Sequence, residues 1–245
     1  MQIWYDMAYD FIGLVNDVNR RLNEVELTSA NFASATGFYS QAKDAVNASI
    51  RYINQSEYNW PFNHTEQTTT LAANTSRYAY PADAKIINFQ SFRIKEDTTL
   101  GNATTRVKEL AYEEYLDKYV AQEYNNSTNQ GVPIYVVQAP DLEFILSPEP
   151  DKAYVLVYEY YTFPTTLSAA TDTTNIPERF RHVIVDGAMY EAYMFRSNLQ
   201  AAGLAKSKFD EGIKHMRSQL INRTPYMRSY MIRRNTTGAV AGFGI

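Results

Sequence analysis

Apolar residues recur at helical spacing near both ends of the chain. Between residues 4 and 22 they fall at intervals of four and three, at Trp4, Ala8, Phe11, Val15, Val18 and Leu22. Such a stripe is typical of a helix that packs against other helices. Similar stripes follow at 38–53, near 180 and near 210. The pattern predicts helices at 3–24 and 36–56 with a loop at 27–36 between them, one from 176 to a break near 198–203, and one from there to Pro225.

The stretch between 65 and 165 alternates with period two and is rich in Tyr, Thr and Val. Alternation of this kind indicates strands with one buried face. The expected strands are 68–71 and 77–80 as one hairpin, 86–94, 106–110, and 142–146 with 154–161 as a second hairpin around the turn 147–152. A short helix at 112–123 interrupts them, because Tyr112, Tyr115, Leu116 and Tyr119 fall at helical spacing.

These elements predict an α+β fold with three parts. Residues 1–62 and 174–222 form an antiparallel helical bundle from both chain ends, 63–173 form an inserted antiparallel β domain with one short helix, and 223–245 form an extended C-terminal arm. The polar stretch 171–175 links the β domain to the third helix. Asn175 is the expected N-cap of that helix, since Pro177 and Glu178 suit a first turn.

Composition narrows the range of functions. The chain has 245 residues, no Cys and a net charge of −4. Without Cys there are no disulfides, thiolate metal sites or Cys nucleophiles. The acidic balance argues against a dedicated nucleic-acid binder. The first residues lack the charged and apolar regions of a signal peptide, and no apolar run approaches the roughly 20 residues that span a membrane.

The search for catalytic chemistry yields scattered residues. His64, His182 and His215 fall on a loop and on two different helices. Carboxylates cluster at Glu113, Glu114 and Asp117, at Asp141 and Glu143, and at Glu149 and Asp151. A turn or a solvated helix face explains these clusters better than a glycosidase pair does. No nucleotide-binding or hydrolase motif occurs. We therefore expect no enzyme activity, no cofactor and no bound metal.

The C-terminal arm combines four arginines with apolar residues and has no acid. Arg223, Arg228, Arg233 and Arg234 suit DNA phosphates or an acidic protein surface. A solvated terminus is the alternative. Because Tyr226, Tyr230 and Ile232 have no use in a solvated tail, we expect an arm that becomes ordered on a partner.

The span from Gly131 to Ala188 carries a resemblance to a known family. It holds, in order, Gly131-Val132-Pro133-Ile134-Tyr135, the strand and turn 142–151 (LEFILSPEPD), the strand 154–161 (YVLVYEYY), Pro164, Leu167 and Ile176-Pro177-Glu178. This order resembles the head-to-tail adaptor proteins of tailed phages, the group that includes tail tubular protein A of short-tailed phages.

The resemblance implies a virion structural protein in the neck of a phage, assembled in the host cytoplasm. It implies a ring, commonly of twelve subunits, that sits below the portal protein, extends the DNA channel and carries the tail nozzle or tail tube. Genomic DNA would pass without sequence-specific binding, no membrane is involved, and tail fibres are a further partner left open. The family has no universal catalytic residues. On this basis the arm is expected to dock on the portal through Tyr226, Arg228, Tyr230, Ile232, Arg233 and Arg234.

Three alternatives stay open at this point. Another virion structural protein, such as a stopper, nozzle or minor capsid component, fits the same composition. A tail-associated glycan or peptidoglycan hydrolase would have to use the carboxylates named above. A carbohydrate-binding β module would explain the aromatic strands but leaves the helices unexplained.

Overall fold

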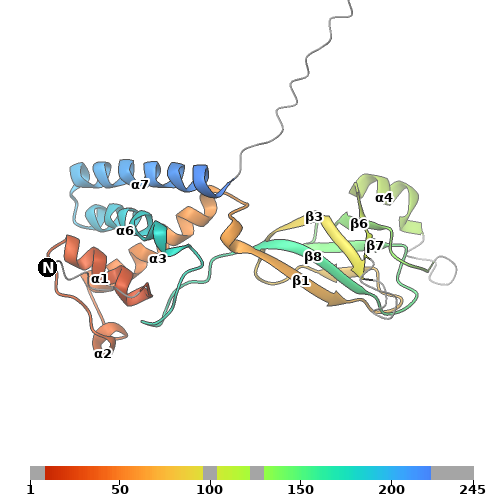
Figure 1. Ribbon diagram of the computed structural model, residues 1–245, viewed down its shortest axis with the longest axis horizontal. Helices are drawn as coiled ribbons and strands as arrows, with labels where there is room; N and C mark the ends of the chain where they lie inside the picture. The colour runs from red at the N-terminus through yellow and green to blue at the C-terminus, as the bar shows by residue number, and fades with distance from the viewer. Residues whose placement is uncertain (1–8, 96–103, 122–129, 222–245) are drawn as a thin grey trace, which may run out of the picture.

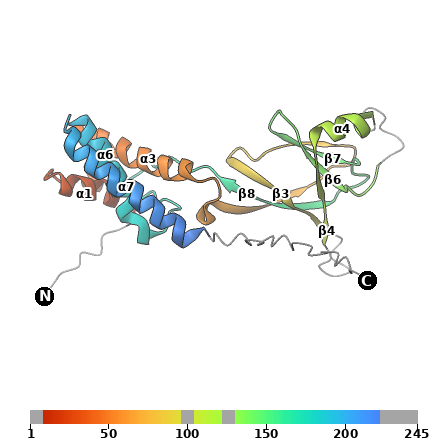
Figure 2. The same ribbon diagram turned by 90° about the horizontal axis from the view of Figure 1, so that it is seen from above.

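The computed structural model describes residues 9–95, 104–121 and 130–221. It confirms the α+β class and has an elongated shape, with helices at one end and strands at the other (Figure 1). The helical end contains α1 (Phe11–Arg21), α2 (Ser29–Phe32), α3 (Phe38–Ser56), α6 (Arg181–Phe195) and α7 (Leu199–Leu220). Two stretches of chain connect the ends, the segment after α3 and the segment after the last strand, β8 (Figure 2).

The helices from both ends of the chain share one apolar core. Side chains of α1, α3, α6 and α7 are buried against one another in it, among them Phe11, Ile50, Ile184 and Phe209. α6 contacts each of the other three helices, which explains why its apolar residues surround its axis instead of forming one stripe. Leu167, from the segment that returns from the strands, packs in the same core.

The helix boundaries differ from the expected ones at several places. The first helix, expected at 3–24, is α1, which starts at Phe11 after the N-cap Asp10 and ends at Arg21. The predicted loop 27–36 contains α2, which begins with a capping box between Thr28 and Asn31. The prediction that Asn175 caps the third helix is wrong. A 3-10 turn, η2 (Glu178–Phe180), follows Pro177, and α6 starts only at Arg181 with no side-chain cap. α7 starts at Leu199, within the expected break, and Asn198 accepts a hydrogen bond from the Ala201 N–H as its cap.

The strands form two four-stranded sheets that pack face to face. Sheet A has the order β1-β8-β3-β4, with β1 (His64–Thr70), β8 (Val155–Thr162), β3 (Ala84–Lys95) and β4 (Thr104–Arg106). Sheet B has the order β2-β7-β6-β5, with β2 (Arg77–Ala79), β7 (Glu143–Ser147), β6 (Tyr135–Gln138) and β5 (Lys108–Leu110). Phe92, Phe144 and Tyr158 pack between the sheets, with ring centroids 4.7–5.5 Å apart.

Both predicted hairpins are wrong. β1 pairs with β8 in sheet A, whereas β2 pairs with β7 in sheet B, so the turn between β1 and β2 crosses from one sheet to the other. The turn 147–152 makes the same crossing between β7 and β8. Period-two alternation reports which face of a strand is buried, and both sheets bury a face in the same core. The pattern is therefore the same for a hairpin and for a crossing.

Two further details of the β prediction need correction. The expected strand 106–110 divides at the buried Val107, whose N–H donates to Phe92 in sheet A, while the N–H of Lys108 donates to Ile134 beside sheet B. The β domain is also not wholly antiparallel, because β5 and β6 pair in parallel.

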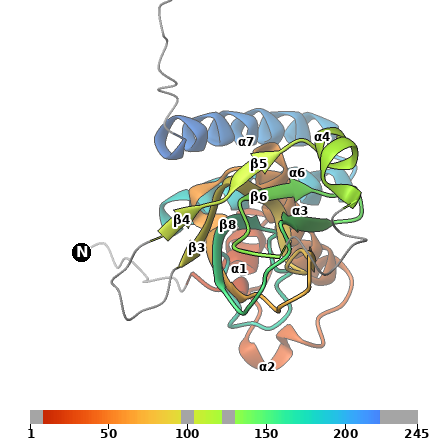
Figure 3. The same ribbon diagram turned by 90° about the vertical axis from the view of Figure 1, so that its right-hand side faces the viewer.

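The two sheets differ in how their outer faces are covered. α4 (Tyr112–Lys118), shorter than the predicted 112–123, lies across sheet B (Figure 3). Its Tyr115 is buried against Val137 and Ile145 on the outer face of that sheet. Within the described residues, no helix packs in this way on sheet A. The outer face of sheet A is therefore the open face of the β body.

Candidate interaction surfaces

The six arm residues predicted to dock on a partner lie outside the described residues. Tyr226, Arg228, Tyr230, Ile232, Arg233 and Arg234 all follow residue 221, where the description ends. Their docking role stays a prediction. The structure does describe the place from which the arm departs, at the end of α7.

The end of α7 lies at the neck, where α3 stops and the strands begin. A helix leaves its last carbonyls without intrahelical partners. Here Lys85 of β3 donates to the carbonyls of Asn54 and Glu57, the latter at 2.7 Å. Arg217 of α7 donates to the Ser56 carbonyl at 3.0 Å and pairs with the Glu57 carboxylate at 2.6 Å. Two cations from different elements thus hold the C-terminal end of α3, where the helix dipole favours positive charge.

The same region buries a tryptophan and a pair of amides. Trp60 is fully buried and its indole N–H donates to the Ile53 carbonyl at 2.7 Å. The side-chain amide of Asn63 donates to that of Asn54. Burial lowers the pKa of the Lys85 ammonium, although the nearby Glu57 carboxylate opposes the shift. The neck is therefore a packed joint, rather than a free linker.

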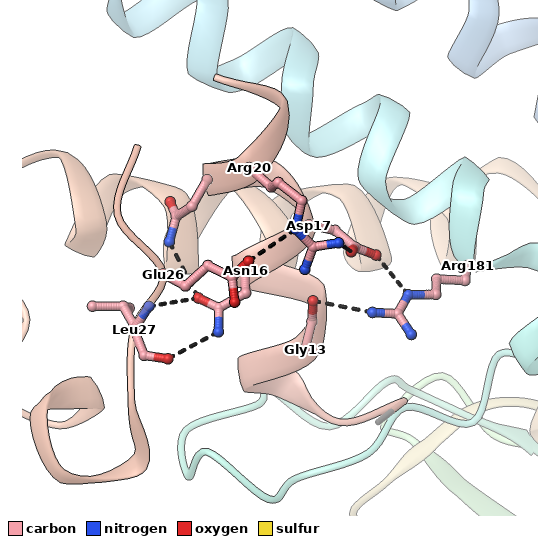
Figure 4. A network of polar contacts seen from close by, with 8 residues as sticks. Gly13, Asn16, Asp17, Arg20, Glu26, Leu27 and Arg181 are labelled. Carbon is pink, nitrogen blue, oxygen red and sulfur yellow. Dashed lines mark hydrogen bonds and ion pairs between the residues drawn. The ribbon is translucent and has the colours of Figure 1, made fainter. Parts of the chain in front are cut away.

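A polar network ties the first helix to the second half of the bundle (Figure 4). Arg181 of α6 donates to the Asp17 carboxylate at 2.6 Å and to the Gly13 carbonyl at 3.1 Å. The Asn16 amide donates to the Leu27 carbonyl at 2.9 Å and accepts from its N–H at 2.7 Å. The network fixes both α1 and the loop after it, so the ion pairs have a structural explanation and do not suggest catalysis.

The end of the bundle farthest from the strands carries exposed apolar side chains. Leu199 and Leu204 of α7 are 69% and 66% exposed, and Val25 is 75% exposed. Met194 and Phe195 at the end of α6 are also exposed. A depression of about 280 Å³ beside Leu204 is bordered by Arg21, Asp186 and Lys208. Exposed apolar side chains with charged neighbours are typical of a protein contact surface. We call these five residues the apolar tip.

The open face of sheet A carries like charges directly opposite one another. Glu66 of β1 faces Glu159 of β8, and Arg93 of β3 faces Arg106 of β4. Such pairs destabilise a sheet. A depression of about 350 Å³ lies between them, lined by both carboxylates and by Arg93. The sequence could not reveal these pairs, because they depend on strand register, between distant strands for Glu66 and Glu159 and between consecutive strands for Arg93 and Arg106.

One residue in a turn of sheet B has an unusual backbone conformation. Leu142, in the turn between β6 and β7, has φ +62° and a side chain 72% exposed. This left-handed conformation costs an L-residue about 1 kcal/mol or more, and it is held here by a bond from the Tyr80 N–H to the Leu142 carbonyl. An apolar side chain so presented is a further candidate contact.

The candidate catalytic residues do not converge. His64, His182 and His215 lie on β1, α6 and α7. Glu114 pairs with Lys118 at 2.7 Å, and Asp151 accepts from the Tyr154 hydroxyl at 2.6 Å. Desolvation, and after it this hydrogen bond, raises the pKa of Tyr154 to about 12. In the part of the chain that the structure describes, no three His, Asp or Glu side chains are placed to hold a metal. Nor does any helix among residues 9–95, 104–121 and 130–221 meet the length and hydropathy of a membrane span.

Comparison with known proteins gives one match that covers both ends of the molecule. The family model described as SU10 adaptor protein matches residues 9–235, which includes the helices, both sheets and part of the predicted arm. No curated protein matches the chain significantly. Since the match extends over nearly the whole chain, the protein belongs to the SU10 adaptor protein family.

Proposed function

We propose that this phage adaptor forms a ring below the portal, continues the DNA channel and carries the tail nozzle. The observation behind the proposal is that the adaptor family covers residues 9–235, and this family is one of structural proteins of the virion. The number of subunits, twelve by resemblance to adaptors such as tail tubular protein A, is part of the proposal.

The arrangement of surfaces supports assembly into a ring. Subunits in a ring mate through two different faces that close on themselves. The bundle carries the apolar tip, whereas the β body carries the open face of sheet A and the exposed Leu142, so the two halves of this elongated molecule offer different contacts. The bundle is suited to side-by-side packing in the ring, and the β body to contact with tail components.

The charge distribution supports a passage for DNA that does not bind it tightly. Four of the 23 Lys and Arg residues lie in the arm, and none of the 27 Asp and Glu residues do. Residues 1–221 therefore carry a net charge of −8, with 19 basic and 27 acidic side chains. An acidic body repels the phosphate backbone, which suits a conduit and disfavours retention.

We infer that the arm at 223–245 docks on the portal. Arg228, Arg233 and Arg234 would face portal carboxylates, while Tyr226, Tyr230 and Ile232 would fill apolar pockets. Buried aromatic anchors commonly contribute about 2 kcal/mol or more each. The free subunit is expected to stay monomeric and to close a ring only on the portal.

A truncation tests this docking. The full-length protein and a protein truncated after Arg223 are each mixed with the portal of the same phage and separated by gradient sedimentation. We expect only the full-length protein to move with the portal, while circular dichroism shows that both are folded. Equal co-sedimentation of the two proteins would place docking on the described surfaces instead.

A further inference from the structure

β1 is a long sheet edge without the usual protection. The other three edge strands of the two sheets, β2, β4 and β5, have three residues each, whereas β1 has seven. All seven pair with β8 without a bulge, and none is Pro or Lys. Proteins normally protect such an edge, because its free N–H and C=O groups recruit other strands. Among the described residues, no strand pairs with the outer side of β1.

The charge beside this edge favours a basic strand. Glu66 lies in the middle of the first half of β1, is exposed and faces Glu159 across the ladder. His64 lies 3.3 Å from the Glu159 carboxylate, while Glu66 forms no ion pair within the residues that the structure describes. An arginine placed next to Glu66 would relieve the repulsion between the two carboxylates.

The C-terminal arm departs close to where β1 begins. Arg217, three residues before the end of α7, pairs with Glu57, and β1 starts at His64 after one 3-10 turn. Both side views show the end of α7 beside the chain that leads into β1 (Figures 1 and 2). Five extended residues, enough to pass from Ile221 to Tyr226, span at most about 17 Å. Arg217 of α7 and Lys85 of β3 bind the same end of α3, so the arm leaves beside the neck end of sheet A.

Residues 226–232 of the arm have the pattern of a strand that would fit this edge. They are seven, like those of β1, and their side chains alternate between Tyr226, Arg228, Tyr230, Ile232 and Met227, Ser229, Met231. Tyr and Ile favour strands. The segment carries a positive charge and no acid, which complements Glu66 and Glu159.

We propose that, in the free subunit, residues 226–232 pair along β1 of the same chain as a fifth strand of sheet A. The proposed pairing is parallel: the arm would enter it from the neck, where β1 begins. Arg228 lies beside Glu66, which sets Tyr226 beside His64 and Tyr230 beside Thr68. The arm covers the free backbone N–H and C=O groups of β1, and these groups in turn bind the arm.

This pairing deepens the proposed function, and it rests on that proposal only for its consequence. Residues that pair with β1 are not available to the portal, so portal docking has to displace the arm. Displacement of the arm would expose the β1 edge only when the subunit assembles on the portal. The pairing is a property of the free protein and is tested without a portal. A negative result would therefore rule out the pairing and leave the adaptor function untouched, and a failure of the adaptor function would leave the pairing untouched.

Hydrogen exchange on the free protein tests the pairing. We expect the β1 amides to exchange at least about tenfold more slowly in the full-length protein than in the protein truncated after Arg223. Arg228→Glu should remove most of this protection, and Glu66→Arg combined with Arg228→Glu should restore it. Arg234→Glu, outside the paired segment, is the matched control and should have no effect. Equal exchange of β1 with and without the arm would overturn the proposal.

Disulfide trapping distinguishes pairing within a chain from pairing between chains. The protein has no Cys, so a pair introduced at Thr68 and Tyr230 is the only one available. We expect an intrachain disulfide in Thr68→Cys/Tyr230→Cys at low protein concentration. Thr68→Cys/Met231→Cys places the second thiol on the opposite face and should form it much more slowly. Cross-links between chains only, or equal rates in both variants, would contradict the proposed pairing.

Discussion

Glycine at position 187 allows three helices to meet. A Cβ there would lie 2.3 Å from Ser49 Oγ on α3 and 2.7 Å from the Phe209 ring on α7. The Ser49 hydroxyl donates to the Ile184 carbonyl of α6 at 2.8 Å, so the contact is both close and hydrogen-bonded. Gly187 is buried within α6. Its role as the closest approach of helices from both chain ends appears only in three dimensions.

Gly187→Ala should therefore destabilise the bundle. Overpacking of this kind costs about 1–3 kcal/mol in the free energy of unfolding, which urea denaturation measures. Gly203→Ala is the matched control in α7, because a Cβ there meets nothing within 4 Å. In a helix interior that change should be neutral or stabilise by up to about 1 kcal/mol. Similar effects of the two substitutions would contradict the close packing at Gly187.

Asp172 couples the linker after the strands to the first helix. Its carboxylate accepts from the N–H groups of Ser168 and Ala169 at 2.7 and 2.8 Å. These hydrogen bonds hold the pKa of Asp172 below its usual value. The carbonyls of Ala170 and Asp172 in turn accept from the first N–H groups of α1. The linker thus supplies bonds that the start of a helix otherwise lacks.

The lowered pKa of Asp172 predicts the pH at which the turn at 168–172 loses its stabilising hydrogen bonds. A carboxylate with a lowered folded-state pKa stabilises the fold fully above its unfolded pKa, near 3.8, and loses that contribution as pH falls through the lower folded value. Amide exchange at Ser168 and Ala169 should therefore rise, beyond its intrinsic pH dependence, only below about pH 3.8. Asp172→Asn should remove this acid-dependent step. The same step in both proteins would assign it to another group.

At the scale of elements, the sequence predicted correctly those elements that depend on interactions between residues close together in the chain. α3 and α7 lie close to their predicted positions, because a stripe at intervals of three and four is set within the helix itself. The hairpins failed, since β1 pairs with β8 across more than eighty residues. The opposed pair Glu66–Glu159 depends on the same long-range register, whereas Arg93–Arg106 depends on the register of two consecutive strands. The six arm residues lie outside the description and stay predicted.

The capped end of α3 should make the neck sensitive to Arg217. Arg217→Ala removes the ion pair with Glu57 and the bond to the Ser56 carbonyl, and bonds to charged groups contribute about 1.5–3 kcal/mol. We expect faster amide exchange in the last turn of α3 and red-shifted Trp60 emission in a Trp4→Phe background. Arg196→Ala, which removes the pair with Glu24 at the other end of the bundle, should leave both signals unchanged. If both variants changed amide exchange and Trp60 emission equally, Arg217 would not be what holds the end of α3 at the neck.

The three-part division of the chain, 1–62 with 174–222, 63–173 and 223–245, stays a prediction that a deletion can test. Replacing residues 65–162 by a short linker removes the strands but keeps Leu167 and the bonds of the linker to α1. We expect a soluble protein with helical circular dichroism and a cooperative melt. Complete loss of the helical signal would mean that the bundle needs the strands to fold.

The whole molecule is an elongated adaptor subunit whose described surfaces differ from end to end. The apolar tip lies at the helical end, and the like-charged pairs and Leu142 lie on the β body. The arm starts at the joint between the two. The arm can therefore bind a partner while the end of α7, from which it starts, stays attached to both the helical bundle and the β body.

Electron microscopy of the full-length protein mixed with the portal of its phage tests the adaptor role most directly. The account predicts that the protein alone shows no rings, and that portal particles gain a second ring below the first with an open central channel. Portals without added density at saturating protein, or closed rings of the free protein, would contradict it.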